Sequence, residues 1–192
     1  MAKTATQSKK EAAERRREAA EREHRSEAAR RQIRTLGDPV LREKAVPVTQ
    51  FDDRLRELAD RMIKIMDDAP GIGLAAPQLG VVKRLLVYQV HDDEAHALVN
   101  PEIVWRSEET DLHDEGCLSV PAVVVPVERA VRIRVHAQDI HGGPLDYEAE
   151  EMEARVIQHE SDHLDGVLIL DRTSRRERAR ALRELREADA LF

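Results

Sequence analysis

The sequence has few of the side chains that build aromatic cores or disulfide-stapled folds. Aromatic residues make up 3% of the 192 residues, so the core must be mainly aliphatic. The single cysteine, Cys117, excludes an intrachain disulfide and fits a reducing compartment, so we expect a cytoplasmic protein. Apolar runs are too short for a membrane span, and we expect no secretory leader. The length suits one domain with an ordinary core.

Charge is unevenly distributed along the chain. The formal net charge is −7, yet residues 1–31 carry ten Lys and Arg against six Glu, a balance of +4. This segment has many oppositely charged pairs at i,i+4 spacing but no apolar stripe and no heptad seam. We predict that residues 1–32 form a charged extension, helical or disordered, which is solvated or contacts RNA or a protein partner. The acidic body, residues 33–192, argues against DNA binding.

Hydrophobic periodicity predicts an α+β domain. Apolar residues recur at helical spacing within residues 52–68, and residues 175–190 form a charged helix with sparse apolar contacts. Strands are expected at residues 83–90, 97–104, 123–127, 131–135 and 145–149. Asn100-Pro101 predicts a bend or bulge, and His141-Gly-Gly-Pro144 predicts a hairpin turn.

A further helix is predicted around the segment Gln158-His-Glu-Ser-Asp-His-Leu-Asp-Gly166, with the glycine as its stop. His159 and His163 are four residues apart, so both imidazoles would project from one helical face and could bind one divalent metal. Glu160 could then act as general base towards a metal-bound water. The alternative is a surface helix with two unrelated histidines. A catalytic metal site also needs a third protein ligand and one open position.

The segment Glu115-Gly-Cys-Leu-Ser119 supplies a candidate for that ligand. Cys117 as thiolate would complete a Cys-His-His site whose fourth position is open to water. The alternative is a buried, inert cysteine. Upstream, residues 71–80 are rich in glycine and small side chains, which permit close backbone approach to a strand or a ligand. Taken alone, this stretch predicts a tight loop in which Gln78 bonds backbone.

Three segments together resemble the signature motifs of peptide deformylases, in that family's order. They are Gly71-Ile-Gly-Leu-Ala-Ala-Pro-Gln78, Glu115-Gly-Cys-Leu-Ser119 and Gln158-His-Glu-Ser-Asp-His-Leu-Asp-Gly166. The opening Gly37-Asp-Pro-Val-Leu-Arg42 is also similar to the start of that family. The resemblance spans about residues 33–172 and implies antiparallel or mixed sheets packed around the central H-E-x-x-H helix.

The resemblance implies hydrolysis of the N-formyl group from formylmethionyl nascent peptides, with release of formate. In that family's scheme Cys117, His159 and His163 hold the metal, and a metal-bound water is the nucleophile. Glu160 would be the general acid/base. The side chain of Gln78 and the backbone N–H of Leu118 would stabilise the oxyanion.

The resemblance also implies a substrate site and a metal. Peptide would lie extended beside Gly73, and Ile72 and Val156 would line the methionine pocket. Glu115 and Asp162 would orient metal ligands. Fe²⁺ is the implied metal, although ligand spacing alone equally allows Zn²⁺, Ni²⁺ or Co²⁺.

The sequence departs from the family outside its motifs. The charged extension is not part of the family core, and Pro121-Ala-Val-Val-Val-Pro126 is more apolar and lacks the Gly and Arg often seen there. The basic C-terminal helix or the N-terminal arm could contact the ribosome, with the arginines at positions 175, 176, 178, 180 and 183 as candidates. A solvated helix is the alternative.

Two rival functions follow from the same motifs. A zinc peptidase would need a downstream His or Glu as third ligand, and no His follows His163. An inactive, ribosome-binding homologue would be expected to lose Glu160, Gln78 or a ligand, and all of these are present.

Overall fold

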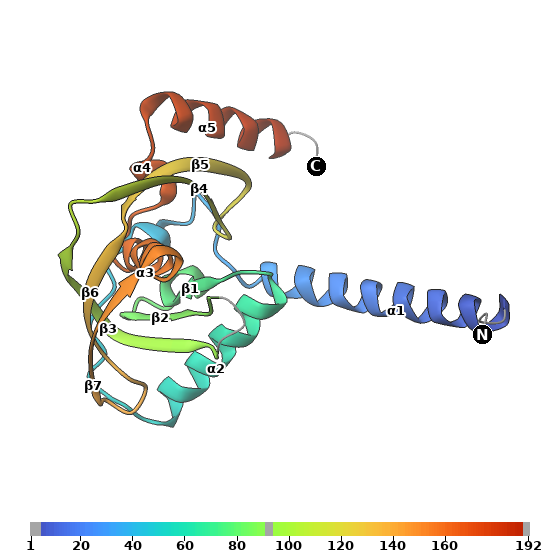
Figure 1. The fold of residues 1–192 in the computed structure, drawn as a ribbon, viewed down its shortest axis with the longest axis horizontal. Coiled ribbons are helices and arrows are strands. Elements are labelled where there is room, and N and C mark those ends of the chain that lie inside the picture. Colours follow the sequence, from blue (N-terminus) through green and yellow to red (C-terminus); the bar gives the residue numbers. More distant parts are fainter. Residues whose placement is uncertain (1–4, 91–93, 190–192) are drawn as a thin grey trace.

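Two antiparallel sheets enclose one central helix (Figure 1). The computed structural model describes residues 5–90 and 94–189. Its helices are α1 (Ala5–Arg30), α2 (Asp53–Asp68), α3 (Glu151–Leu164), α4 (Ile169–Arg172) and α5 (Arg175–Asp189), with 3₁₀ helices η1 (Pro39–Arg42) and η2 (Ala76–Leu79). Its strands are β1 (Gly73–Ala75), β2 (Leu85–Tyr88), β3 (His96–Arg106), β4 (Thr110–Cys117), β5 (Val120–Ala130), β6 (Arg132–Gln138) and β7 (Pro144–Glu150). Within these described ranges, no helix is both long and apolar enough to cross a membrane.

The larger sheet has the strand order β1-β2-β3-β6-β7, and β4 pairs with β5 in a separate ribbon. The combination of helices and antiparallel sheets confirms the α+β prediction, and helix α3, which carries His159 and His163, contacts strands of both sheets. The expected strands all occur, with longer or shorter ends. The structure adds β4, which the sequence did not reveal, because its side chains are mostly polar and exposed and do not alternate.

The glycine-rich stretch is more ordered than the tight loop predicted from it alone. Gly73–Ala75 forms strand β1, which pairs with β2, and the next four residues form η2. All residues from 73 to 79 are buried. Small side chains are therefore needed here because this segment passes through the interior beside α3.

Helix α2 shows why the periodicity predicted this element well. Its buried side chains, Leu55, Ala59, Met62, Ile65 and Met66, follow helical spacing and face the core. The carboxylate of Asp52 caps the N-terminus by accepting a hydrogen bond from the backbone N–H of Leu55 at 3.1 Å.

The predicted bulge at Asn100 and the predicted hairpin turn are both present. Asn100 has a φ of +52°, lies at a register shift between β3 and β6, and its side chain bonds both backbone groups of Val48. In the β6–β7 hairpin, the carboxylate of Asp139 accepts hydrogen bonds from the N–H groups of His141 and Gly143, each at 2.8 Å.

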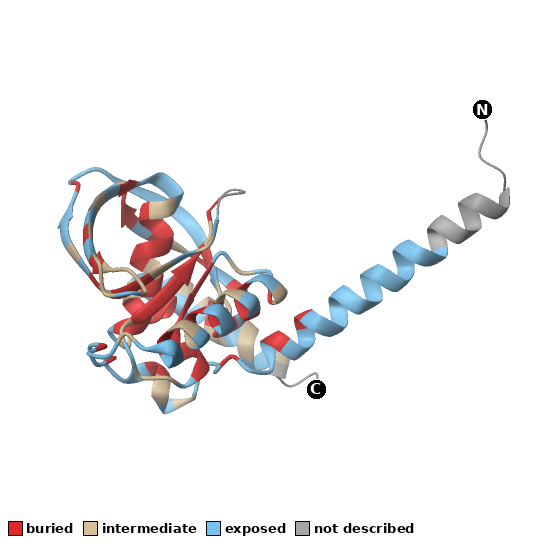
Figure 2. Cartoon of the chain, turned by 90° about the horizontal axis from the view of Figure 1, so that it is seen from below, coloured by how far each residue is buried: buried red, intermediate tan, exposed pale blue. Residues whose placement is uncertain are grey.

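Helix α1 projects from the body, and its residues 13–25 are all exposed (Figure 2). Its last turn differs from an entirely solvated arm, because Ser26 and Ala29 are buried. Ala29 and the following Ile33 join the core cluster of α2, and Arg25 pairs with Asp68 at 3.6 Å. Because only the small side chains of Ser26 and Ala29 are buried in this contact, the sequence of α1 has no apolar stripe that would predict it.

Helix α5 packs on β5 through Ala181, which is fully buried, and through the half-buried Leu182 and Leu185. Arg180 donates to the backbone carbonyl of Val124 at 2.8 Å and pairs with two glutamates of its own helix. This arginine is therefore engaged in holding α5 to the domain.

Gly166 generates the first prediction. It ends α3 with a φ of +73°, and a Cβ placed there would lie 2.6 Å from the backbone oxygen of Arg42. Gly166→Ala should lower the free energy of unfolding by about 3 kcal/mol, since backbone strain and a backbone clash add. Urea unfolding measures the change.

Gly37→Ala is the matched control. Its φ is +110°, but nothing lies within 4 Å of the added Cβ, so only the backbone strain of about 1 kcal/mol applies. Equal losses for both variants would show that the contact with Arg42 does not matter.

Candidate metal centre and its pocket

The three predicted metal ligands meet in the structure although they come from two distant elements. Cys117 ends β4, and His159 and His163 lie one turn apart on α3. One ligand atom of each lies within 4.8 Å of the others, and Cys117 Sγ is 3.3 Å from His163 Nε2. A thiolate and two imidazoles fit a divalent ion such as iron or zinc, with a further position left for a small molecule.

The protonation of Cys117 favours metal binding. Burial alone would raise the pKa of its thiol, but the facing imidazoles of His163 and His159 favour the thiolate and hold the pKa well below its usual value. The thiolate is the form that binds metals.

Glu115 fixes the orientation of one ligand. Its carboxylate accepts a hydrogen bond from Nδ1–H of His159 at 2.9 Å, which leaves Nε2 of that ring as the atom able to bind a metal. Arg129 donates to both oxygens of Glu115 at 3.0 Å, and Arg155 donates to one at 2.7 Å. Burial opposes ionisation, but these bonds outweigh it and hold the pKa of Glu115 at about 2.

Asp162 extends the same network. It accepts a hydrogen bond from Arg129 at 2.6 Å and a bidentate pair from Arg172 at 3.0 and 2.5 Å. The network therefore joins β4, β5, α3 and α4 through charged side chains, most of them buried. Glu115 and Asp162 were expected beside the ligands, whereas the arginines were not.

One of those arginines had a signal in the sequence. Arg155, His159 and His163 follow each other at four-residue spacing, so Arg155 had to share the helical face of the ligands. For Arg129 no such signal exists, because its burial depends on how β5 pairs with β4 and packs beneath α3.

Glu160 is a buried carboxyl without a full set of partners. Its side chain lies against Gly73, where a Cβ would be 2.4 Å from Oε1. Oε2 has no hydrogen-bond partner among the residues that the structure describes. Burial raises the pKa of Glu160 above its usual value, so this group is suited to accept and return a proton.

Gln78 is buried beside the ligands and its amide is held in one orientation. Its Oε1 accepts from the backbone N–H of Ala75 at 2.8 Å, so the NH₂ group faces Ser119 Oγ at 3.1 Å and Cys117 Sγ at 4.0 Å. It bonds backbone, as the loop interpretation expected, but its NH₂ group also faces the ligand cluster.

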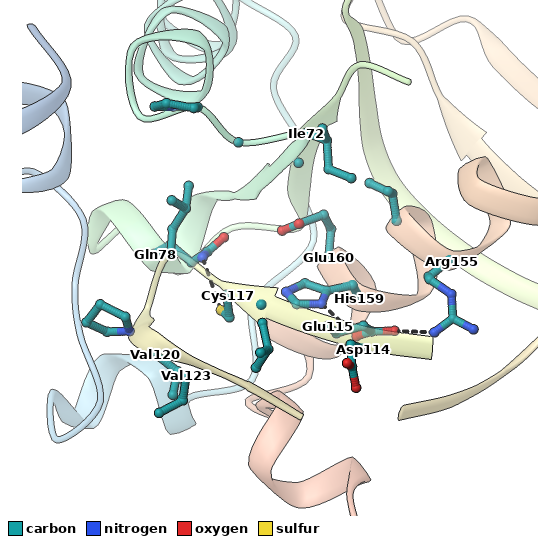
Figure 3. A pocket seen from close by; sticks show the side chains of 18 of the residues that line it. Ile72, Gln78, Asp114, Glu115, Cys117, Val120, Val123, Arg155, His159 and Glu160 are labelled. Carbon is teal, nitrogen blue, oxygen red and sulfur yellow. Dashed lines mark hydrogen bonds and ion pairs between the residues drawn. The ribbon is translucent and has the colours of Figure 1, made fainter. Parts of the chain in front are cut away.

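A cavity of about 760 Å³ opens onto the candidate metal ligands Cys117 and His159 (Figure 3). Every predicted site residue except the fully buried His163 lines it: Ile72, Gly73, Gln78, Cys117, Leu118, Val156, His159 and Glu160. Ile72 is 52% exposed and Val156 is buried, so the apolar walls lie both at the surface and inside. The segment 120–124 of β5 forms the opposite wall.

Several known proteins are similar to this chain. Residues 30–179 match the family model described as polypeptide deformylase. The chain is 48% identical over 159 residues to the peptide deformylase of Acidothermus cellulolyticus, covering 83% of this chain and 87% of the relative. It is similar to the crystal structure of the Thermotoga maritima peptide deformylase, with a TM-score of 0.72 and 48% identity over 74% of this chain and 96% of that one.

A solved peptide deformylase from Legionella pneumophila gives a TM-score of 0.78 at 42% identity. That match covers 83% of this chain and 95% of the other.

The carboxylate of Glu115 generates the second prediction. Glu115→Gln removes the negative charge that holds Nδ1–H of His159, and should weaken Zn²⁺ or Co²⁺ binding by about 10- to 100-fold. Competition titration with a chelator measures the affinity. Glu128→Gln on the exposed face of β5 is the control, since Glu128 bonds only Thr110 among the described side chains. Unchanged affinity in a folded Glu115→Gln variant would contradict the orienting role.

Proposed function

The chain belongs to the peptide deformylase family of metal-dependent hydrolases, and from this premise we propose how its residues act. Its substrate is the N-terminal formylmethionine of newly synthesised peptides, from which it removes the formyl group as formate. The observation that carries the assignment is the buried carboxyl of Glu160 beside a Cys-His-His donor set at the floor of an open cavity.

Cys117, His159 and His163 would hold one divalent metal, with Fe²⁺ as our first choice and Zn²⁺, Ni²⁺ or Co²⁺ as alternatives. When bound, the metal supplies Lewis acidity, which makes water more acidic and polarises the formyl oxygen. Glu115 contributes by holding His159 in the tautomer that presents Nε2 to the cluster. The donor set is rigid because a network of charged hydrogen bonds surrounds it.

Glu160 moves the proton in both halves of the reaction. It takes a proton from the attacking water as the oxygen–carbon bond to the formyl group forms. It then gives that proton to the methionine nitrogen as the carbon–nitrogen bond breaks, which yields formate and a free amine. Its burial supports this role, because it raises the pKa of the carboxyl and so makes the carboxylate a stronger proton acceptor than an exposed one.

Two donors would stabilise the negative charge that develops on the formyl oxygen. The NH₂ group of Gln78 faces the ligand cluster, and its orientation is fixed through Ala75. The backbone N–H of Leu118 lies in the turn between β4 and β5, next to Cys117. Donors that are already oriented cost no rearrangement when the charge appears.

The substrate peptide would lie beside β1, whose second edge is unpaired in the described sheet. Gly73 allows the backbone to approach Glu160 closely, and Ile72 and Val156 offer apolar contacts to the methionine side chain.

Transient ribosome contact stays a prediction: Arg175, Arg176 and Arg183 of α5 are exposed and offer charge to RNA phosphates. We also propose that the enzyme acts in the cytoplasm, where nascent peptides arise.

Glu160→Gln tests the proton transfer. The variant should retain about one metal per chain but release formate from formyl-Met-Ala-Ser about 100- to 10,000-fold more slowly, because the amide cannot take a proton. Formate release and metal content are measured on the same anaerobically purified sample, with Glu128→Gln as control. Near-normal turnover in Glu160→Gln would rule out the assigned role.

Gly73→Ala tests the close approach. The added methyl group would displace the Glu160 carboxyl, and misplacing a catalytic group by about 1 Å can cost about 100-fold in turnover. The thermal midpoint and metal content report whether the fold survives. Gly37→Ala, which lies outside the cavity, should leave turnover unchanged. Full activity in Gly73→Ala would mean that Glu160 does not act from the observed position.

A further inference from the structure

An exposed arginine lies at the mouth of the cavity. Arg30, the last residue of α1, lines the cavity together with Thr35, Pro70 and Gly71. Its side chain is exposed. Among the residues that the structure describes, it makes no ion pair or side-chain hydrogen bond. A free guanidinium beside a substrate cavity is suited to bind a carboxylate.

The neighbouring arginines of α1 are engaged differently. Arg25 pairs with Asp68 at 3.6 Å, and Arg31 pairs with Glu27 at 3.3 Å. Neither of them lines the cavity. Arg30 therefore differs from both in its position and in having no carboxylate of the described chain beside it.

The position of Arg30 is tightly fixed by the chain on both sides. Ala29 is 3% exposed and Ile33 is 6% exposed, and both pack in the core cluster of α2. Further on, the N–H of Arg34 donates to the carbonyl of Gln78 at 2.7 Å, and the N–H of Leu36 donates to Ser119 O at 2.8 Å. The segment that follows α1 is thus bonded to η2 and to the turn between β4 and β5, which both lie beside Cys117.

The substrate must leave the reacting centre on the side of Arg30. The reaction takes place beside Gly73 and Glu160, and every residue from 74 to 79 is buried, which closes one direction along β1. In the other direction Gly71 is half-buried and Pro70 is exposed. A peptide paired with this edge therefore continues past Gly71 towards Pro70.

The distance matches the early residues of the peptide. Three residues of an extended peptide span about 10 Å. A substrate whose formylmethionine lies beside Gly73 therefore places its third or fourth residue at the mouth, within reach of a long side chain such as Arg30. Among the other charged groups that line the cavity, Glu115 and Arg155 are buried and bonded to each other, and Asp114 lies beside Glu115 on β4 (Figure 3).

The geometry points to Arg30 as a residue that determines specificity, by binding a carboxylate on the third or fourth residue of the formylated peptide. The inference rests on the proposed deformylation and goes beyond it. It implies that the enzyme prefers acidic over basic residues at that distance from formylmethionine. The hydroxyl of Thr35, exposed on the same rim, is a second donor for the carboxylate.

The test compares amidated peptides that lack a terminal carboxylate. Formyl-Met-Ala-Xaa-Ala-amide and formyl-Met-Ala-Ala-Xaa-amide are prepared with Glu, Gln or Lys at Xaa, and kcat/KM is measured from formate release. In one series or both, the native enzyme should favour Glu over Gln by about threefold to fivefold, the size of an exposed ion pair, with Lys below Gln. Raised salt should shrink this ranking, since salt screens exposed charges.

Arg30→Gln should abolish the ranking and leave kcat/KM for the Gln peptides unchanged. Arg31→Gln, which removes another exposed charge next to the same helix end, should keep the ranking. A purely structural role of Arg30 at the helix C-terminus would alter stability but not the order of the three peptides.

The outcomes separate the two proposals. Normal hydrolysis of the Gln peptides with no preference among Glu, Gln and Lys would overturn the role of Arg30 while leaving deformylation intact. A Glu preference that survives in Arg30→Gln would also overturn it. No hydrolysis of any peptide by metal-loaded enzyme would instead contradict the proposed function.

Discussion

Glu115 joins three elements through one buried carboxylate. It accepts hydrogen bonds from Arg129 of β5 and from Arg155 and His159 of α3, while its own backbone belongs to β4. Taking these charges out of water costs several kcal/mol per ion unless each is paired, so the arrangement is stable only as a complete set. The two-stranded ribbon, the central helix and the ligand set are therefore interdependent, and we expect the site to form only when the ribbon has docked on α3.

Two glycines allow close packing around the site. Gly73 brings the backbone of β1 against Glu160, and Gly71 lies against the side chain of Leu118, where a Cβ would be 2.9 Å from Cδ1. Any side chain at position 73 would occupy the space of the Glu160 carboxyl. In the proposed function, the same absence of side chains gives an extended peptide room beside the strand edge, so one sequence feature serves both the proton-transferring group and the substrate.

The charged extension contacts the rest of the protein at the C-terminal end of α1. Residues 13–25 of α1 are exposed, whereas its last turn packs on α2 and ends at the cavity mouth. Just after this turn, the backbone N–H groups of Arg34 and Leu36 bond to Gln78 and Ser119. The substrate site is therefore bordered by a segment that begins outside the predicted domain boundary at residue 33.

The sequence by itself determined the local elements and the donor set. Helical periodicity specified α2, four-residue spacing placed His159 and His163 on one face of α3, and the single cysteine left only one thiol for the site. These inferences succeed because they depend on neighbours along the chain. Tertiary structure alone decided that Arg129 is buried with Glu115, that β4 pairs with β5, and that Arg30 borders the cavity. Each of these depends on which distant segments meet, and no local pattern of charge or hydrophobicity encodes that.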